Sequence, residues 1–236
     1  MTGGLEIALM KIKETAKSVY DRGWGEATSG NMSICLRDSV QTLNHESQIL
    51  NSVYPFLAGK TIVITSSGSR MRHISAGRPE NYCSVITLND EGSSYFMTGK
   101  KENTPSSELS AHLKLHNYFA KERPDINSVL HCHPDQIISL LHLKAFKTRE
   151  AVDKMLFDIH TEAQLLIPDG VGLVGLKKPG SEELAEAVLK ELRNTQIVLI
   201  EKHGCISSGR DLDEALDKIE FVNNAIKIYF EIIKFK

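Results

Sequence analysis

Short apolar runs of strand length alternate with helical patterns along this chain. Residues 61–65 (TIVIT) and 197–200 (IVLI) are rich in β-branched side chains, as buried strands are. Several intervening segments repeat apolar residues every three to four positions, which is typical of amphipathic helices. This alternation predicts an α/β fold in which helices cover both faces of a sheet.

The same patterns predict the individual elements. Residues 84–88 and 93–98 flank the turn sequence Asn89-Asp90-Glu91-Gly92, so they are expected to form an antiparallel hairpin. Residues 37–54 are polar and irregular, which indicates a surface loop or hairpin. No repeat or linker divides the chain, so one domain over residues 1–236 is expected. Further strands are predicted at 32–36, 127–133 and 163–167. Helices are predicted at 5–21, 135–143, 150–157, 181–192 and from 213 onward. Another helix is expected to begin after 105–108, with Ser106 or Ser107 as its cap.

The composition argues against a charged partner and against an oxidising compartment. The 236 residues carry a formal net charge of −2, so no basic field favours nucleic acid or an anionic membrane. The four cysteines are scattered without a C-x-x-C pair, which favours reduced thiols. The first residues lack a signal-peptide pattern, and no apolar run approaches about 18 residues. A cytoplasmic protein without a membrane span is expected.

His131-Cys132-His133 ends a predicted strand directly after the apolar pair Val129-Leu130. Residues i and i+2 of a strand project to one face. His131 and His133 therefore point together, and Cys132 points away as a small core residue. Two imidazoles on one face suit Zn²⁺ or a similar cation. The alternative interpretation is a pair of structural histidines.

A third ligand would come from another part of the chain, and His203 is the best candidate. It follows the predicted strand 197–200 and precedes Gly204, which permits close backbone approach. A single histidine at the end of a strand is more often not a metal ligand. The residues alone therefore do not decide whether His203 completes the ligand set. His112 and His116 also have a metal-binding spacing, but their pattern favours an ordinary helix face.

Two carboxylates are candidate acid/base groups. Glu108 stands in the first turn of its predicted helix, where it either complements the helix dipole or acts in catalysis. Glu162 precedes the predicted strand 163–167, and simple solvent exposure would also explain it.

Three loops of small residues could bind a phosphate through hydroxyls and backbone N–H groups. None matches a Walker or Rossmann pattern, and each taken singly is more typical of an ordinary turn. The loops contain Gly30-Asn31, Ser67-Gly68 and Ser106-Ser107.

Taken together, these features resemble the class II aldolase/adducin family over nearly the whole chain. The motifs that carry the resemblance occur in the family's order: Thr28-Ser29-Gly30-Asn31, Ser67-Gly68, Ser106-Ser107-Glu108, His131-Cys132-His133 and His203-Gly204. One bacterial branch is matched more sharply, through Gly23-Trp24, Ser107-Glu108-Leu109, Thr161-Glu162 and Pro168-Asp169-Gly170-Val171-Gly172.

The resemblance implies a three-layer α/β/α domain around a mixed, largely antiparallel sheet. It implies one Zn²⁺ per subunit, or another divalent metal, held by His131, His133 and His203. It implies a homotetramer with sites at subunit interfaces and reversible cleavage of L-rhamnulose 1-phosphate to dihydroxyacetone phosphate and L-lactaldehyde. The implied site residues are Glu108 as acid/base, Glu162 as a second carboxylate reaching a neighbouring subunit, and Gly30, Asn31, Ser67, Gly68, Ser106 and Ser107 at the phosphate.

Other functions remain open on the same scaffold. The nearest are a fuculose-phosphate aldolase, a ribulose-5-phosphate 4-epimerase and a methylthioribulose-1-phosphate dehydratase. A non-catalytic adducin-like protein would be expected to lack the ligands, yet the three histidines and Glu108 are all present. A structural zinc site usually has four protein ligands, and the sequence offers no convincing fourth.

Overall fold

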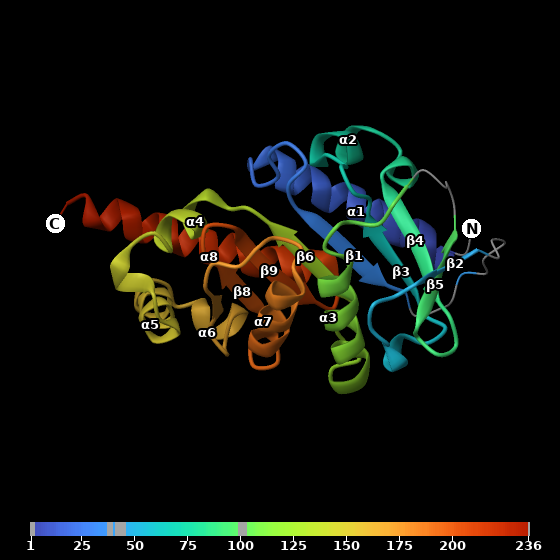
Figure 1. Ribbon diagram of the computed structural model, residues 1–236. Helices are drawn as coiled ribbons and strands as arrows, with labels where there is room; N and C mark the ends of the chain where they lie inside the picture. The colour runs from blue at the N-terminus through green and yellow to red at the C-terminus, as the bar shows by residue number, and fades with distance from the viewer. Residues whose placement is uncertain (1–2, 37–39, 41–45, 99–102, 236) are drawn as a thin grey trace.

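The computed structural model describes residues 3–36, 40, 46–98 and 103–235. In this part of the chain, nine strands form one sheet in the order β2-β5-β4-β3-β1-β6-β9-β8-β7 (Figure 1). Neighbouring strands are antiparallel except β7 and β8, which are parallel. The expected mixed, largely antiparallel sheet is confirmed. The strands are β1 (Asn31–Cys35), β2 (Ser47–Ile49), β3 (Thr61–Thr65), β4 (Cys83–Leu88), β5 (Ser94–Thr98), β6 (Ser128–Cys132), β7 (Gly172–Val174), β8 (Ile197–Ile200) and β9 (Gly204–Gly209).

Helices cover both faces of this sheet, as the alternation of patterns predicted. The α-helices are α1 (Gly3–Asp21), α2 (Met71–Ala76), α3 (Leu109–Glu122), α4 (Asp135–Leu140), α5 (Arg149–Ile159), α6 (Ala163–Leu166), α7 (Glu182–Leu192) and α8 (Leu212–Ile233), with 3₁₀ turns at Pro55–Leu57, Pro79–Asn81 and Lys144–Phe146. Helices α1 and α8 share one apolar core cluster, while α3 and α7 belong to another. In β6, Leu130 and Cys132 join the first cluster and Val129 joins the second. The strand alternation thus separates two cores, and the three layers are confirmed.

Local turn and cap chemistry explains several boundaries. The predicted hairpin β4–β5 forms, and the side-chain oxygen of Asn89 accepts hydrogen bonds from the backbone N–H groups of Ser93 and Ser94. Ser181 caps α7 by accepting from the Leu184 N–H at 3.2 Å. At α3 the N-cap position is taken by Glu108, with no side-chain cap hydrogen bond. Neither predicted serine therefore occupies the cap.

The prediction of a strand at 163–167 is wrong, because Ala163–Leu166 forms the short helix α6. Ala163 is buried, while Leu165 is 75% exposed. The run of apolar residues is too short for its period to distinguish a strand from a helix.

Besides helix α6 and the three 3₁₀ turns, four elements were not predicted from the sequence: β2, α2, β7 and β9. Strand β2 lies within the stretch 37–54 that was predicted as a loop or hairpin, and residues 37–39 and 41–45 of that stretch lie outside the described residues. Among the helices that the structure describes, none is both long and apolar enough to cross a membrane.

Candidate metal and acid–base site

Strand β6 and the residue directly after it place two histidine side chains close together, as the alternation of side chains along a strand predicted. His131 is buried, and its Nε2 lies 3.2 Å from Nε2 of His133, the residue after the next. Cys132 is fully buried on the opposite face of the sheet. The two imidazoles therefore lie on the face of the sheet that α3 covers, and the Cys132 side chain packs in the apolar core on the other face.

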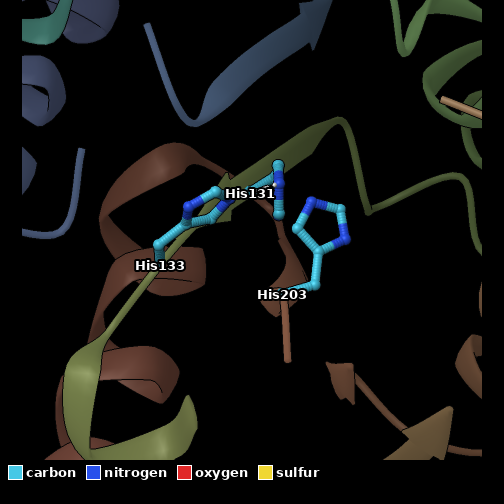
Figure 2. Close-up of side chains that lie close together, drawn as sticks. All are labelled: His131, His133 and His203. Carbon is cyan, nitrogen blue, oxygen red and sulfur yellow. Dashed lines mark hydrogen bonds between the residues drawn. The ribbon is translucent and has the colours of Figure 1, made fainter. Parts of the chain in front are cut away.

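His203 reaches the same point from the turn between β8 and β9. The turn is tight, since Ile200 and Gly204 are already paired across the two strands. Lys202 within it adopts a φ of 59°, a conformation that costs a non-glycine residue of the order of 1 kcal/mol. One ligand atom from each of His131, His133 and His203 lies within 4.8 Å of the others, and the three rings converge (Figure 2).

Hydrogen bonds orient two of these rings. The Nδ1–H of His131 donates to the backbone carbonyl of Cys205 at 2.9 Å, and the Nδ1–H of His133 donates to Oε1 of Glu26 at 3.0 Å. Each bond leaves Nε2 unprotonated and directed at the other histidines. Burial raises the pKa of Glu26, but the hydrogen bond from His133 together with further hydrogen bonds and the charge interaction with His133 outweighs burial, so the net pKa is lowered.

Burial favours the neutral form of His133 and His203, which is the form that binds metal. Burial lowers the pKa of His133, and burial together with the nearby His131 lowers the pKa of His203 to about 4. The Nδ1 atom of His203 is buried and has no hydrogen-bond partner among the described residues. Three imidazoles at this spacing can hold a divalent cation such as Zn²⁺, and a four-coordinate zinc ion would then take one further ligand from solution or substrate.

Glu108 stands at the centre of this arrangement, immediately before α3. Its Oε2 lies 3.7 Å from Nε2 of His131, and its Oε1 lies 3.9 Å from Nε2 of His203. The side-chain N–H of Asn31 donates to Oε2 at 3.0 Å. Burial raises the pKa of Glu108, but the nearby histidines, His131 foremost, and the hydrogen bond from Asn31 together outweigh burial and lower the pKa. The carboxylate is therefore ionised at neutral pH and can accept a proton.

Two of the three predicted phosphate loops lie side by side. Ser66 and Pro105 form an antiparallel bridge, and the backbone N–H of Ser67 donates to the carbonyl of Thr104. Within the described chain, the backbone N–H groups of Gly68 and Ser107 donate to no protein acceptor. Such N–H groups can bind an anion.

Gly30-Asn31 adjoins these two loops at the start of β1, because the backbone N–H of Met32 donates to the Thr65 hydroxyl and the Asn31 amide donates to Glu108, the residue after Ser107. Asn31 is opposite His131 in the sheet, and a Cβ on Gly30 would lie 3.0 Å from the His131 carbonyl. The Asn31 amide contacts Glu108 and His112. Its role at a phosphate stays a prediction.

Glu162 is exposed at the start of α6 and lies outside the histidine group. It lines a surface hollow of about 710 Å³ together with Trp24, Asp135 and His160. Glu108 is not among the residues that line this hollow.

A family model described as "Class II Aldolase and Adducin N-terminal domain" matches residues 10–230. The chain belongs to this family. The class II aldolase/adducin fold was therefore correctly expected from the order of the small-residue loops and histidines.

Relatives extend the match over almost the whole chain. Rhamnulose-1-phosphate aldolase of Bacteroides thetaiotaomicron is 29% identical, with 93% of this chain and 83% of the relative covered. That of Listeria welshimeri is 28% identical, with 96% and 84% covered. The crystal structure of a sugar-phosphate aldolase from Thermotoga maritima matches with a TM-score of 0.87 at 27% identity, covering 99% of this chain and 97% of that chain. The sequence motifs Gly23-Trp24 and Thr161-Glu162 favoured one bacterial branch of the family. The two rhamnulose-1-phosphate aldolases belong to that branch.

Gly204 is needed where the turn that carries His203 meets β6. Its φ is +150°, and a Cβ there would lie 2.3 Å from the Cys132 carbonyl oxygen and 3.0 Å from Cδ2 of His133. We expect Gly204→Ala to destabilise the fold by about 1–3 kcal/mol and to weaken metal binding, because backbone and a candidate ligand would have to move. Urea unfolding and metal titration measure both effects. Gly175→Ala is the control, since a Cβ there meets nothing within 4 Å. Equal behaviour of the two variants would contradict this account of the turn.

His112 and His116 are not exposed helix residues but are buried beneath the site. His112 bonds to Asn31 and Ser33, and His116 bonds to Ser33. Burial lowers the pKa of His112 to about 4 and that of His116 to about 3. Both rings are therefore neutral in the fold at physiological pH.

Acid should consequently destabilise the fold through His116. The pKa of histidine is near 6.5 in the unfolded chain, whereas that of His116 is about 3 in the fold. Between these two pH values the unfolded state therefore binds a proton that the folded state does not bind. Stability is full above pH 6.5 and falls by about 1.4 kcal/mol per pH unit below it for this group. His116→Gln keeps an N–H for Ser33, so it should reduce the slope of urea-unfolding free energy between pH 6.5 and 4. The exposed His142→Gln should not. Parallel curves for all three proteins would refute the assignment.

Proposed function

We propose that this chain is a divalent-metal-dependent sugar-phosphate aldolase that reversibly cleaves L-rhamnulose 1-phosphate to dihydroxyacetone phosphate and L-lactaldehyde. The observation that carries the proposal is the Glu108 carboxylate within 3.7–3.9 Å of two imidazoles in a group of three. The group has the ligand number of a catalytic site rather than of a closed structural one. The similarity to rhamnulose-1-phosphate aldolases supports the choice of substrate.

His131, His133 and His203 would hold the cation, for which we propose Zn²⁺. As a Lewis acid, a divalent cation would polarise the ketose carbonyl and stabilise the negative charge that develops on its oxygen as the carbon–carbon bond breaks. The protein's own contribution begins with orientation. Hydrogen bonds to Cys205 and Glu26 hold two of the imidazoles so that Nε2 faces the site.

In cleavage, Glu108 would accept the proton that the substrate hydroxyl loses as the carbon–carbon bond breaks and would return it to the carbon that the aldehyde leaves. In the reverse direction it would remove the proton from that carbon. Its lowered pKa provides a base at neutral pH, and its position beside the histidines places the acceptor oxygen where substrate would bind. The Asn31 hydrogen bond leaves Oε1 as the free oxygen of the carboxylate on the His203 side. We therefore assign proton transfer to Oε1.

The adjoining loops would bind the phosphate. The backbone N–H groups of Gly68 and Ser107, which have no protein acceptor among the described residues, offer donors without net charge, as do the hydroxyls of Ser67 and Ser106. Binding energy from this remote group would position the sugar carbonyl over the histidines.

The proposal includes a cytoplasmic homotetramer in which Glu162 reaches a neighbouring subunit's site. Its exposure at the rim of a large hollow supports this role, because the side chain is available to a second copy. The proposal also includes one domain over the whole of residues 1–236.

The test is retro-aldol cleavage by purified, zinc-loaded protein. Dihydroxyacetone phosphate would be detected through NADH oxidation by glycerol-3-phosphate dehydrogenase, with and without chelator. Chelator-sensitive turnover of L-rhamnulose 1-phosphate is the expected result. Turnover only of L-fuculose 1-phosphate, ribulose 5-phosphate or methylthioribulose 1-phosphate would reassign the substrate, and no turnover of any would favour an adducin-like binding protein.

A further inference from the structure

A line of buried polar groups runs away from Glu108 beneath the site. Glu108, His112 and His116 are spaced four residues apart, so they lie on one face of α3. Asn31 and Ser33 alternate along β1 and project to a single face of the sheet. The helix face and the strand face meet, and all five side chains are at most 8% exposed.

Four hydrogen bonds join these five groups in order. Glu108 Oε2 and Asn31 Nδ2 are 3.0 Å apart, and Asn31 Oδ1 and His112 Nε2 are 2.6 Å apart. His112 Nδ1 and Ser33 Oγ are 2.6 Å apart, and Ser33 Oγ and His116 Nε2 are 2.7 Å apart. The line ends at His116 Nδ1, which has no partner in the described part of the chain.

The donor and acceptor atoms of each group fix which partner donates in every hydrogen bond of the line. An ionised carboxylate only accepts, so Asn31 presents its N–H to Glu108 and its carbonyl to His112. The carbonyl requires an N–H on Nε2 of His112, and a neutral His112 then accepts at Nδ1 from the Ser33 hydroxyl. Ser33 in turn accepts from the Nε2–H of His116. The reverse direction would leave a buried N–H on His116 unpaired and would turn the Asn31 carbonyl toward the Glu108 carboxylate, and both carry a cost.

The line therefore orients groups rather than supplying protons. Every ring in it is neutral, because burial lowers the pKa of both histidines. Its far end is a buried lone pair, not a proton donor or a group in contact with solvent.

We propose that His112, supported by Ser33 and His116, is a positioning residue that locks the Asn31 amide with its N–H toward Glu108 and so holds the acid/base carboxylate between His131 and His203. This inference rests on the proposed aldolase function for its kinetic consequence. The geometry itself does not depend on the substrate.

Paired variants at His112 separate positioning from packing. His112→Leu removes the donor to Asn31, whereas the amide of Gln in His112→Gln can place an N–H near the position of Nε2. We expect His112→Leu to lower kcat for the cleavage reaction roughly 10- to 100-fold with KM and bound metal changed little, since a hydrogen bond to a charged group is affected. His112→Gln should recover most of kcat. Equal losses in both variants, or losses in proportion to unfolded protein, would overturn the proposal.

Ser33→Ala provides a second, smaller change in case His112→Leu does not fold. It removes the donor to His112 Nδ1 and should lower kcat without lowering bound metal. Unchanged kcat in well-folded Ser33→Ala would contradict the positioning role of the hydrogen-bonded line.

A measurement without substrate keeps the positioning role separate from the choice of reaction. Two-bond ¹H–¹⁵N spectra of histidine-labelled, metal-loaded protein report which ring nitrogen carries the proton. His112 and His116 should both be neutral with the proton on Nε2, and Ser33→Ala should perturb both. A proton on Nδ1 of His112 would refute the proposal, whatever the enzyme cleaves. A protein with the expected tautomers and no aldolase activity would refute the function alone.

Discussion

Glu108→Gln is expected to bind metal normally and to lose two to four orders of magnitude in kcat. General acid–base catalysis by a positioned side chain contributes about 10²- to 10⁴-fold. The amide has the shape of the carboxylate and can still accept the Asn31 hydrogen bond, so the site should keep its geometry. What the amide lacks is the ability to accept a proton at neutral pH.

The measurement is kcat in the coupled cleavage assay, paired with bound metal by atomic emission. Glu122→Gln is the matched control, because Glu122 is exposed near the other end of α3 and pairs only with Lys121 among the described ions. That variant should turn over at the wild-type rate. Near-normal turnover by Glu108→Gln would remove Glu108 from the mechanism, and loss of metal would show that the carboxylate supports the cation instead.

The parts of the site that could be predicted are those set by local periodicity. Strand alternation places His131 and His133 together and sends Cys132 into the core, and both outcomes follow from a period of two. The β-branched run Thr61–Thr65 likewise forms a strand with the predicted bounds. Periodicity is a property of neighbouring residues, so it needs no knowledge of the fold.

The parts that could not be predicted depend on contacts between distant residues. Glu26 reaches His133 across 107 positions of sequence, and Asn31 reaches Glu108 across 77. No local pattern marks either pair. His112 and His116 have the spacing of an ordinary helix face, and only the fold shows that this face packs on Ser33 rather than facing water.

Strand β9 shows a second limit of local patterns. Its sequence, GCISSG, lacks a clear apolar alternation, yet all of its residues are buried. Small residues are required there because α8 packs closely, and a Cβ on Gly209 would lie 2.7 Å from the backbone nitrogen of Ala215. Burial by close approach of backbone therefore leaves little hydrophobic signal in the sequence.

His203→Ala is expected to lose metal binding and, with it, the cleavage reaction. The other two candidate ligands are His131 in β6 and His133 directly after it, and two imidazoles alone offer fewer ligands than catalytic zinc sites use. A bound ion stabilises only the folded state, by about 2.7 kcal/mol at a free concentration of 100 Kd. Added Zn²⁺ should therefore raise the melting temperature of the metal-stripped wild type and leave that of His203→Ala unchanged.

Two further variants show whether the loss is specific to a ligand. Glu26→Gln weakens the orientation of His133 but removes no ligand, so metal affinity should fall by roughly 10- to 100-fold while full occupancy remains attainable. His142→Ala replaces an exposed histidine outside the cluster and should bind metal as the wild type does. Chelator competition gives the three affinities, which should rank His142→Ala, then Glu26→Gln, then His203→Ala. Wild-type stoichiometry and affinity in His203→Ala would show that the cation is held elsewhere, and the convergence of the three rings would then need another explanation.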